Sequence, residues 1–468
     1  YTVSWGLVYD ANQTIALHSS WGWTQINDYP VISAPLLFED LPAGVMCLEI
    51  VLYNGSGSEG EVLDEDDDCA TIPEGDGGDD PEGVITTVVE LKVGQTSLQL
   101  NENGVPYIAY VNEDQGMGDL DLAYSVEVGD EEGWLDDTVV AGSFNPKEIS
   151  HIIDGDFMHL SFVEIYETSA NKLIYRQGTQ SSDDGRYDSW SGYEIDITDI
   201  NQSATAIQKD SNESLYIVYE ADDSLMMAYC TEGDVLDCVS SGWGTMRIST
   251  QGGKDASFVI DEFDDFHVAF HDEISGKLMY AFCPNSCETS SSQWSILTVD
   301  SGSGETIGRN TDIAVDEDGV HISYTKYGDD GAGGAGRLVK YAFFKYSDSS
   351  WNLQGITLVT AEEATSIATY DGNVYIAFYN DGKLQGASNS EGAWGTVDLD
   401  APEDTDVGTH VSMAISEDGD FHIVYYDATN EALRHLFMEN GGEGGDLPNW
   451  DCNGPDNDQD GDFDAYNQ

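Results

Sequence analysis

Residues 416–427 read SEDGDFHIVYYD, and the six residues at their centre, DFHIVY (420–425), recur in variant form along most of the chain. Each copy has His or Tyr, then an aliphatic residue, a small residue (Ala, Ser or Val), and Tyr or Phe. The copies follow one another at intervals of 47 to 57 residues, and their first ring-bearing positions are Tyr107, His159, Tyr216, His267, His321, Tyr375 and His422. Self-similarity at a nearly constant spacing indicates a repeat architecture.

Each copy predicts a strand that is buried on both sides, because both faces of its two-residue alternation carry apolar or aromatic groups. A turn rich in Asp, Asn and Gly precedes it, after an earlier short strand, and a third strand such as KLMYAF (277–282) follows. In the first six copies a tryptophan then opens a fourth strand: Trp134, Trp190, Trp243, Trp294, Trp351 and Trp394. Four short strands per unit, repeated seven times, predict an all-β fold, a seven-bladed β-propeller.

The seventh unit lacks a fourth strand, and ITTVVEL at 85–91 resembles the fourth strands of the other units. We predict that it closes the ring as the outer strand of the last blade, so that no sheet edge stays unpaired. The propeller is then predicted over 85–450 and an acidic Gly/Pro-rich linker over 73–84. Residues 1–72 are expected to form a small disulfide-braced β-sandwich, since so small a domain has little surface to bury.

The first strand of this small domain places Val3, Trp5, Leu7 and Tyr9 on one face. Two arrangements are open: it adds onto a neighbour's sheet, or it pairs within its own domain. The first would make the N-terminal domain a site of self-association or of contact with other surface proteins.

The chain has 16 Lys and Arg against 89 Asp and Glu, a net charge of −73. Such a surface repels nucleic acid and anionic membranes, so neither is an expected partner; it either favours cations or only confers solubility. No apolar run approaches the roughly 18 residues of a membrane span. The chain starts at Tyr1 rather than Met, as expected of a mature secreted protein or of a fragment.

The spacing of the seven cysteines predicts three disulfides and an extracellular or cell-surface location. The expected pairs are Cys47–Cys69, Cys230–Cys238 and Cys283–Cys287. Cys452 is left for a partner outside this chain or beyond its end. A zinc site is the less favoured alternative, because no CxxC pair faces another.

The C-terminal run PDNDQDGDFDAYN breaks the repeat pattern and forms a predicted calcium-binding tail over 451–468. Calcium requires hard oxygen ligands, and a glycine between them lets the chain curl round the ion. The alternative is an acidic tail without bound metal. The run resembles the calcium loops of thrombospondin type 3 and dockerin-like repeats, although it is a single copy. The candidate ligands are Asp456, Asp458, Asp460, Asp462 and Asp464.

The repeats, of the form DxDGxxHIxY…LxYA, resemble those of the sialidase-like and lectin-like propellers over about residues 85–440. That resemblance implies the fold more than an activity. A sialidase would carry an arginine triad and repeated SxDxGxTW boxes, whereas this chain has six arginines and one loose box at 181–190. The His/Tyr positions and the turn aspartates are expected to serve packing and turns rather than chemistry.

Our first functional hypothesis is a secreted or cell-surface structural or adhesive protein that is not an enzyme. It would be acidic, stabilised by calcium and disulfides, and built into an extracellular filament or another surface assembly. The alternative is a carbohydrate-binding or carbohydrate-processing propeller, that is, a lectin or a glycosidase with glycans as its partners.

Overall fold

The computed structural model describes residues 2–9, 13–15, 44–54, 61–72 and 83–440, the last range with gaps at 115–117, 129–130, 141–144, 167–169, 181–185, 197–199, 232–237, 240–241, 286, 289, 330–334, 362, 390–393 and 403. The chain divides into two compact units, Tyr1–Asp79 and Asp80–Gln468.

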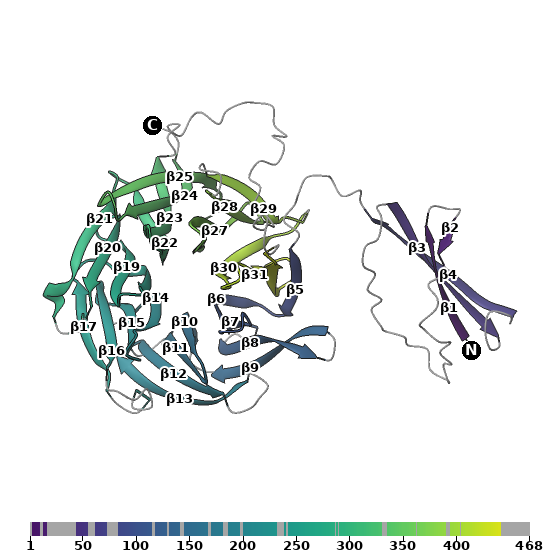
Figure 1. Ribbon diagram of the computed structural model, residues 1–468, viewed down its shortest axis with the longest axis horizontal. Helices are drawn as coiled ribbons and strands as arrows, with labels where there is room; N and C mark the ends of the chain where they lie inside the picture. The colour runs from purple at the N-terminus through teal and green to yellow at the C-terminus, as the bar shows by residue number, and fades with distance from the viewer. Residues whose placement is uncertain are drawn as a thin grey trace. The chain divides into compact units, whose positions relative to one another are not determined.

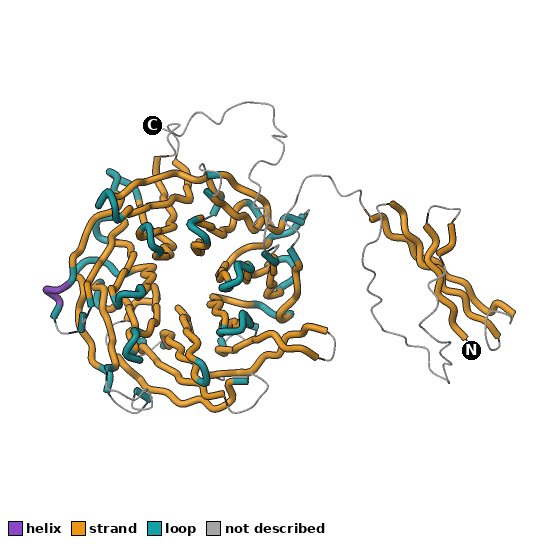
Figure 2. The backbone as a smooth tube through the Cα atoms, in the orientation of Figure 1, coloured by secondary structure: helices purple, strands orange, loops and turns teal. Residues whose placement is uncertain are grey.

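The larger unit is a ring of seven four-stranded antiparallel sheets, which confirms the predicted seven-bladed propeller (Figure 1). In each sheet the first strand lies nearest the ring centre and the fourth lies outermost (Figures 1 and 2). Blade 1 consists of β6 (Val93–Leu100), β7 (Pro106–Asn112), β8 (Asp119–Val128) and β9 (Glu131–Val140); blade 2 of β10 (Pro146–Asp154), β11 (Phe157–Glu164), β12 (Lys172–Gln180) and β13 (Tyr187–Asp196); blade 3 of β14 (Ile200–Lys209), β15 (Leu215–Ala221), β16 (Ser224–Cys230) and β17 (Gly244–Ser249); blade 4 of β18 (Lys254–Ile260), β19 (Asp265–Asp272), β20 (Lys277–Pro284) and β21 (Ser295–Asp300).

The remaining blades follow the same plan. Blade 5 consists of β22 (Thr306–Val315), β23 (Gly319–Asp329), β24 (Ala335–Lys345) and β25 (Ser350–Val359); blade 6 of β26 (Thr365–Tyr370), β27 (Asn373–Asn380), β28 (Lys383–Ser388) and β29 (Gly395–Asp400); blade 7 of β30 (Val407–Ile415), β31 (Phe421–Asp427), β32 (Ala432–Met438) and β5 (Val84–Val89). A short 3-10 helix, η2 (Ser291–Gln293), precedes β21.

The second strand of each blade carries the repeated His/Tyr pattern and forms the core. Every residue of β15 and β31 is buried, and β11 and β19 are buried from their second residue onward. The strands are therefore covered on both faces, as their lack of a polar face predicted.

The turn aspartates hold the hairpins between the first and second strands. Asp261 Oδ1 accepts the backbone N–H groups of Phe263 and Asp265, both at 2.9 Å. Asp210 and Asp316 accept two backbone N–H groups each in the same way. Aspartate favours such turns because its side chain bonds its own main chain two residues on.

The tryptophans of the fourth strands join neighbouring blades. In four cases the indole lies against a ring on the third strand of the preceding blade, with centroids 4.9 to 5.2 Å apart. Blade-to-blade packing thus places a large aromatic group at each of these seams. The pairs are Trp134–His435, Trp243–Tyr175, Trp351–Tyr280 and Trp394–Tyr341.

Strand β5 closes the ring by pairing antiparallel with β32, in the place that the sequence predicted for residues 85–91. Val88 is buried in the seam between blades 7 and 1, together with Val93 and Val424. The last blade therefore combines strands from both ends of the ring-forming sequence, and its outer edge is paired.

In the smaller unit, the described strands form one antiparallel sheet with the order β2-β1-β3-β4. Their bounds are β1 Thr2–Tyr9, β2 Gln13–Ile15, β3 Gly44–Asn54 and β4 Glu61–Ile72. Because β1 is paired on both sides, it pairs within its own domain and is not a free edge for a neighbour's sheet. The β3–β4 register sets Cys47 opposite Cys69; their side chains lie outside the described part of the chain.

Two of the predicted disulfides, Cys230–Cys238 and Cys283–Cys287, are formed. Each closes a short loop beside the end of a third strand. Across the described residues, no helix has both the length and the apolar character that a membrane crossing needs.

Candidate functional site

The predicted calcium ligands lie outside the described residues, as does Cys452: Asp456, Asp458, Asp460, Asp462 and Asp464. The calcium site therefore stays a prediction. Within the described residues, no group of three or more His, Cys, Asp or Glu side chains is arranged to hold a metal ion.

The His/Tyr column is buried, with exposed fractions between 0 and 6%. In blades 2, 4 and 5 the histidine Nδ1 is hydrogen-bonded to a tyrosine hydroxyl of the third strand, at 2.6 to 2.7 Å, and Nε2 faces a carboxylate at the start of the hairpin. Burial lowers the pKa of His159 to about 4, so this histidine is neutral at pH 7. An Asp–His–Tyr arrangement that recurs in three blades fits packing rather than catalysis: Asp154–His159–Tyr175, Asp261–His267–Tyr280 and Asp316–His321–Tyr341.

A different set of polar residues gathers where the inner strands begin. The pairing of inner and second strands shifts register there in six of the seven blades, for example between Lys147 and Ser150 and between Lys254 and Ser257. Such bulges re-aim side chains and are frequent beside functional sites. Four non-glycine residues adopt positive φ angles at these bulges, of 50 to 55°: Glu148, Asp255, Asn310 and His410.

Hydrogen bonds link these residues from blade to blade. Gln95 Nε2 donates to Glu148 Oε2 at 2.9 Å, and Gln95 Oε1 accepts the backbone N–H of Glu148. The carboxylate of Asp255 accepts Arg309 Nε and, at 3.1 Å, the N–H of Asn310. We call Gln95, Glu148, Asp255 and Arg309 the ring-centre cluster, because all four lie at the starts of strands that surround the centre of the ring (Figure 1).

The pKa of Glu148 is shifted far from its ordinary value. Burial, reinforced by the charge of Asp255, raises the pKa of Glu148 to about 7, against the opposing effects of the Gln95 hydrogen bond and of Lys147 and Lys254. A carboxyl group with this pKa is protonated about half of the time at neutral pH and can give up or accept a proton there.

Cations surround the cluster and are paired with acids. Lys147 Nζ lies 2.5 Å and Lys92 Nζ 3.0 Å from the carboxylate of Glu113, and these contacts lower the pKa of Glu113 to about 2. Lys254 pairs with Glu273 at 3.1 Å. Together with Arg309, these three lysines are four of the chain's sixteen cationic side chains. The numbers of acidic and basic groups near the cluster are therefore far closer to equal than in the whole chain.

Sequence reasoning missed the ring-centre cluster, although a signal was present. The inner strands contain KEIS at 147–150, KDAS at 254–257 and RNTD at 309–312, each with a cation, a polar residue, one further residue and Ser or Asp. Aligning the inner strands on that Ser or Asp would have placed Glu148, Asp255 and Asn310 at one level of the ring.

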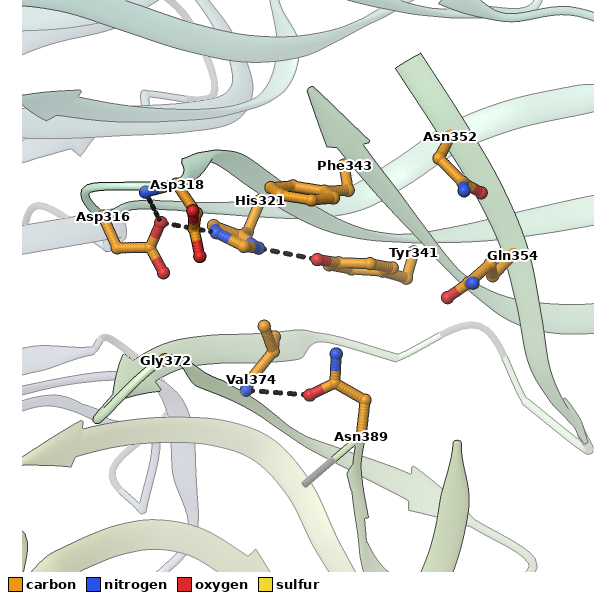
Figure 3. A pocket seen from close by; sticks show the side chains of 10 residues that line it. All are labelled: Asp316, Asp318, His321, Tyr341, Phe343, Asn352, Gln354, Gly372, Val374 and Asn389. Atoms are coloured by element: carbon orange, nitrogen blue, oxygen red, sulfur yellow. Dashed lines mark hydrogen bonds and ion pairs between the residues drawn. The ribbon is translucent and has the colours of Figure 1, made fainter. Parts of the chain in front are cut away.

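A pocket of about 160 Å³ opens between blades 5 and 6 (Figure 3). It lies at the ends of the inner strands, whereas the ring-centre cluster lies at their starts, so the two sites are on opposite faces of the ring. Blade 5 supplies most of the lining, and blade 6 supplies a tight hairpin and an amide. The lining residues are Asp316, Asp318, His321, Tyr341, Phe343, Asn352, Gln354, Gly372, Val374 and Asn389.

The sequence matches no known family model and no curated protein. Solved structures with a similar fold include the NanB sialidase of Streptococcus pneumoniae (TM-score 0.42, 11% identity, covering 75% of this chain and 69% of that chain). Others are the GH93 α-L-arabinofuranosidase of Fusarium graminearum (TM-score 0.42, 11% identity, 76% and 98%) and the polysaccharide lyase Uly1 (TM-score 0.47, 9% identity, 73% and 89%).

These structures contradict our expectation that the chain is not an enzyme, because the propellers that cover three quarters of it are enzymes named for carbohydrate substrates. At 9 to 11% identity the likeness shows the fold alone, and the activity of this chain has to be argued from its own residues.

Proposed function

We propose that this protein is an extracellular carbohydrate-processing enzyme that cleaves glycosidic bonds at the ring-centre cluster. The observation that carries the proposal is Glu148, a carboxyl group whose pKa of about 7 is set by burial and by Asp255, and which Gln95 fixes in place. Glycoside hydrolysis commonly needs one carboxyl group that is protonated at working pH, beside a second carboxylate.

In this proposal Glu148 acts as the proton donor. Its proton passes to the glycosidic oxygen, the bond between that oxygen and the anomeric carbon breaks, and the bonding electron pair leaves with the oxygen. A water molecule then bonds to the anomeric carbon, and the proton that this water loses returns to the carboxylate of Glu148. Asp255, whose carboxylate is paired with Arg309, supplies negative charge toward the positive charge that develops on the sugar. Gln95 is a positioning residue, since it bonds both the side chain and the backbone of Glu148.

The charge of the chain bears on the class of saccharide. A net charge of −73 repels polyanionic chains, so neutral saccharides are the favoured substrates. The two disulfides support the extracellular part of the proposal, because such bonds persist in oxidising compartments.

The test is a hydrolysis screen of the full chain against aryl glycosides and neutral polysaccharides, comparing the wild type with Glu148→Gln. Gln keeps the size of Glu and can bond Gln95, but it cannot donate the proton; we expect activity to fall by about 10²-fold or more. Glu102→Gln, in an exposed turn of blade 1, is the matched control and should keep full activity.

The pH profile gives a second readout. Because the donor must be protonated, kcat/KM should fall as the pH rises above about 7, the pKa of Glu148. No hydrolysis of any tested glycoside, or full activity in Glu148→Gln, would refute the proposal.

A further inference from the structure

One side of the pocket between blades 5 and 6 is an aromatic wall made by His321, Tyr341 and Phe343. Their rings lie nearly parallel, at interplanar angles of 17 to 26°, and Phe343 is 4.6 Å from His321 between centroids. The hydrogen bond of 2.6 Å between His321 Nδ1 and the Tyr341 hydroxyl fixes two of the rings (Figure 3). His321 and Tyr341 are each only 3% exposed and Phe343 stacks on His321, so the wall is rigid and the partly exposed Phe343 presents most of its accessible apolar surface.

Side-chain amides surround this wall. Asn389 Oδ1 accepts the Val374 N–H at 3.0 Å, and Figure 3 shows the amide nitrogen of Asn389 turned toward the rings across the pocket. Gln354 Oε1 accepts Trp394 Nε1 at 2.6 Å, which orients its amide, and Asn352 is exposed at the rim. Each amide presents both a donor and an acceptor, as needed to bond hydroxyl groups.

Blade 4 shows that this lining is a local departure from the repeat. It has the same ring trio, His267, Tyr280 and Phe282, but the residues opposite Phe282 and Tyr280 on the fourth strand are Ser295 and Leu297. In blade 5 these two positions are the amides Asn352 and Gln354. The structural core of the blade is thus retained, while its rim is changed from a hydroxyl and an apolar side chain to two amides.

The hairpin of blade 6 leaves room for the pocket at one end. This hairpin has only two residues between β26 and β27, Asp371 and Gly372, whereas three residues join β22 and β23 in blade 5. Gly372 has a φ of +74°, and apart from its two chain neighbours no residue has a heavy atom within 4 Å of the place where a Cβ would be. The short turn with its glycine therefore leaves one end of the pocket open.

A second hollow continues from the first. It shares Phe343 and Asn352 with the pocket and adds Trp351, which is partly exposed, and Leu353, which is 39% exposed. Trp351 packs against Tyr280 of blade 4, so its side chain lies on the opposite face of the strand from Asn352. The second hollow therefore lies around the turn between β24 and β25, and its lining also includes Lys345 and Asp348.

Charge and size narrow the class of ligand. The pocket lining contains Asp316 and Asp318 but no Lys or Arg, so an anionic ligand would be repelled. A volume of about 160 Å³ is small beside the roughly 300–1,000 Å³ of sites for drug-sized ligands. A single ring that has one apolar face and several hydroxyl groups fits all three features: the aromatic wall, the amides and the carboxylates.

We propose that this pocket binds one ring of a neutral saccharide. It would be an accessory site, on the opposite face from the ring-centre cluster, and it would hold the protein on a polymeric glycan without taking part in bond cleavage. Binding here does not depend on the reaction proposed at Glu148.

The test measures binding by isothermal titration calorimetry with the full chain carrying Glu148→Gln, so that the probes are not consumed. The probes are neutral hexasaccharides of β-1,4-linked glucose, mannose and xylose and of α-1,4-linked glucose, with an oligogalacturonate as the anionic comparison. We expect at least one neutral hexasaccharide to bind and the oligogalacturonate not to bind.

Two single substitutions then locate the site. Asn352→Ala removes an exposed amide, and Gln354→Glu keeps the acceptor for Trp394 while removing the amide donor. Each should weaken binding about five- to tenfold, as expected for the loss of one hydrogen bond. Ser295→Ala, at the equivalent place in blade 4, should leave binding unchanged, and circular dichroism checks that all variants are folded.

Absence of binding by every neutral hexasaccharide, preferred binding of the oligogalacturonate, or unchanged affinity in both pocket variants would each overturn the inference. In the chain with Glu148 intact, the pocket variants should hydrolyse a small aryl glycoside at the wild-type rate. A failure of the pocket to bind and a failure of Glu148 to act are therefore separate results.

Discussion

Glu148→Gln should stabilise the protein at alkaline pH while it removes activity. In the folded protein the pKa of Glu148 rises from 4.5 to about 7, so the fold holds the proton more tightly than the unfolded chain does. Between these two pH values the unfolding free energy therefore falls as the pH rises. At about 1.4 kcal/mol per pKa unit, the full cost of ionising Glu148 in the fold is about 3 kcal/mol above pH 7.

The amide introduced by Glu148→Gln carries no charge at any pH and can accept the hydrogen bond from Gln95, so the variant lacks this cost. We expect wild type and Glu148→Gln to have similar unfolding free energies at pH 4.5, and the variant to be more stable by up to about 3 kcal/mol at pH 8. The assay is urea unfolding followed by tryptophan fluorescence at several pH values between 4.5 and 8. Glu102→Gln serves as the control and should show no such trend. A stability difference between Glu148→Gln and wild type that is constant from pH 4.5 to 8 would show that Glu148 has an ordinary pKa. The proposed role of Glu148 as proton donor would then be wrong.

Three further predictions concern the fold and the tail. Tyr175→Phe leaves Nδ1 of the buried His159 without its hydroxyl partner and should lower the unfolding free energy by about 1–3 kcal/mol, whereas Tyr327→Phe, at a half-exposed position, should change it by less than about 0.5 kcal/mol. Val88→Asp places a charge in the seam closed by β5 and should lower the melting temperature by several degrees. The control is Val84→Asp, on the same strand but 60% exposed, which should leave the melting temperature unchanged. Equal melting temperatures of the two variants would argue against closure by β5. Calorimetry with calcium chloride should show that the full chain binds calcium and that the double variant Asp458→Asn/Asp460→Asn does not. If the wild type shows no heat of binding, the calcium prediction is wrong.

Much of the propeller could be predicted because its sequence repeats. A buried second strand has to be apolar on both faces, so DFHIVY and its relatives are visible without any structure. The tryptophans were equally visible, since one large ring is needed at the seam between blades. The place of residues 85–91 followed from counting strands, because a seventh blade with three strands would leave an open edge.

The candidate site was harder to predict, because it depends on what differs between blades. Gln95, Glu148, Asp255 and Asn310 share a level in the ring but not a residue type, and a shift of register separates them from the regular alternation of the strand. An acid such as Glu148 is also hard to recognise among 89 acidic residues, since its pKa depends on burial that only the fold supplies. For the pocket, the decisive change from Leu297 to Gln354 has meaning only once the two blades are superimposed strand by strand.

The closure of the ring by β5 also determines how the propeller would respond to a pulling force. Val84, at the first residue of β5, pairs with Phe437 near the end of β32, so the chain enters and leaves the ring at the same end of this strand pair. Tension applied through both flanking segments would peel β5 from β32 one residue pair at a time, beginning at Val84, instead of loading all of the hydrogen bonds at once. The closing seam would then be the mechanically weakest part of the propeller: under load the ring would open at the seventh blade before any of the other six blades is stretched.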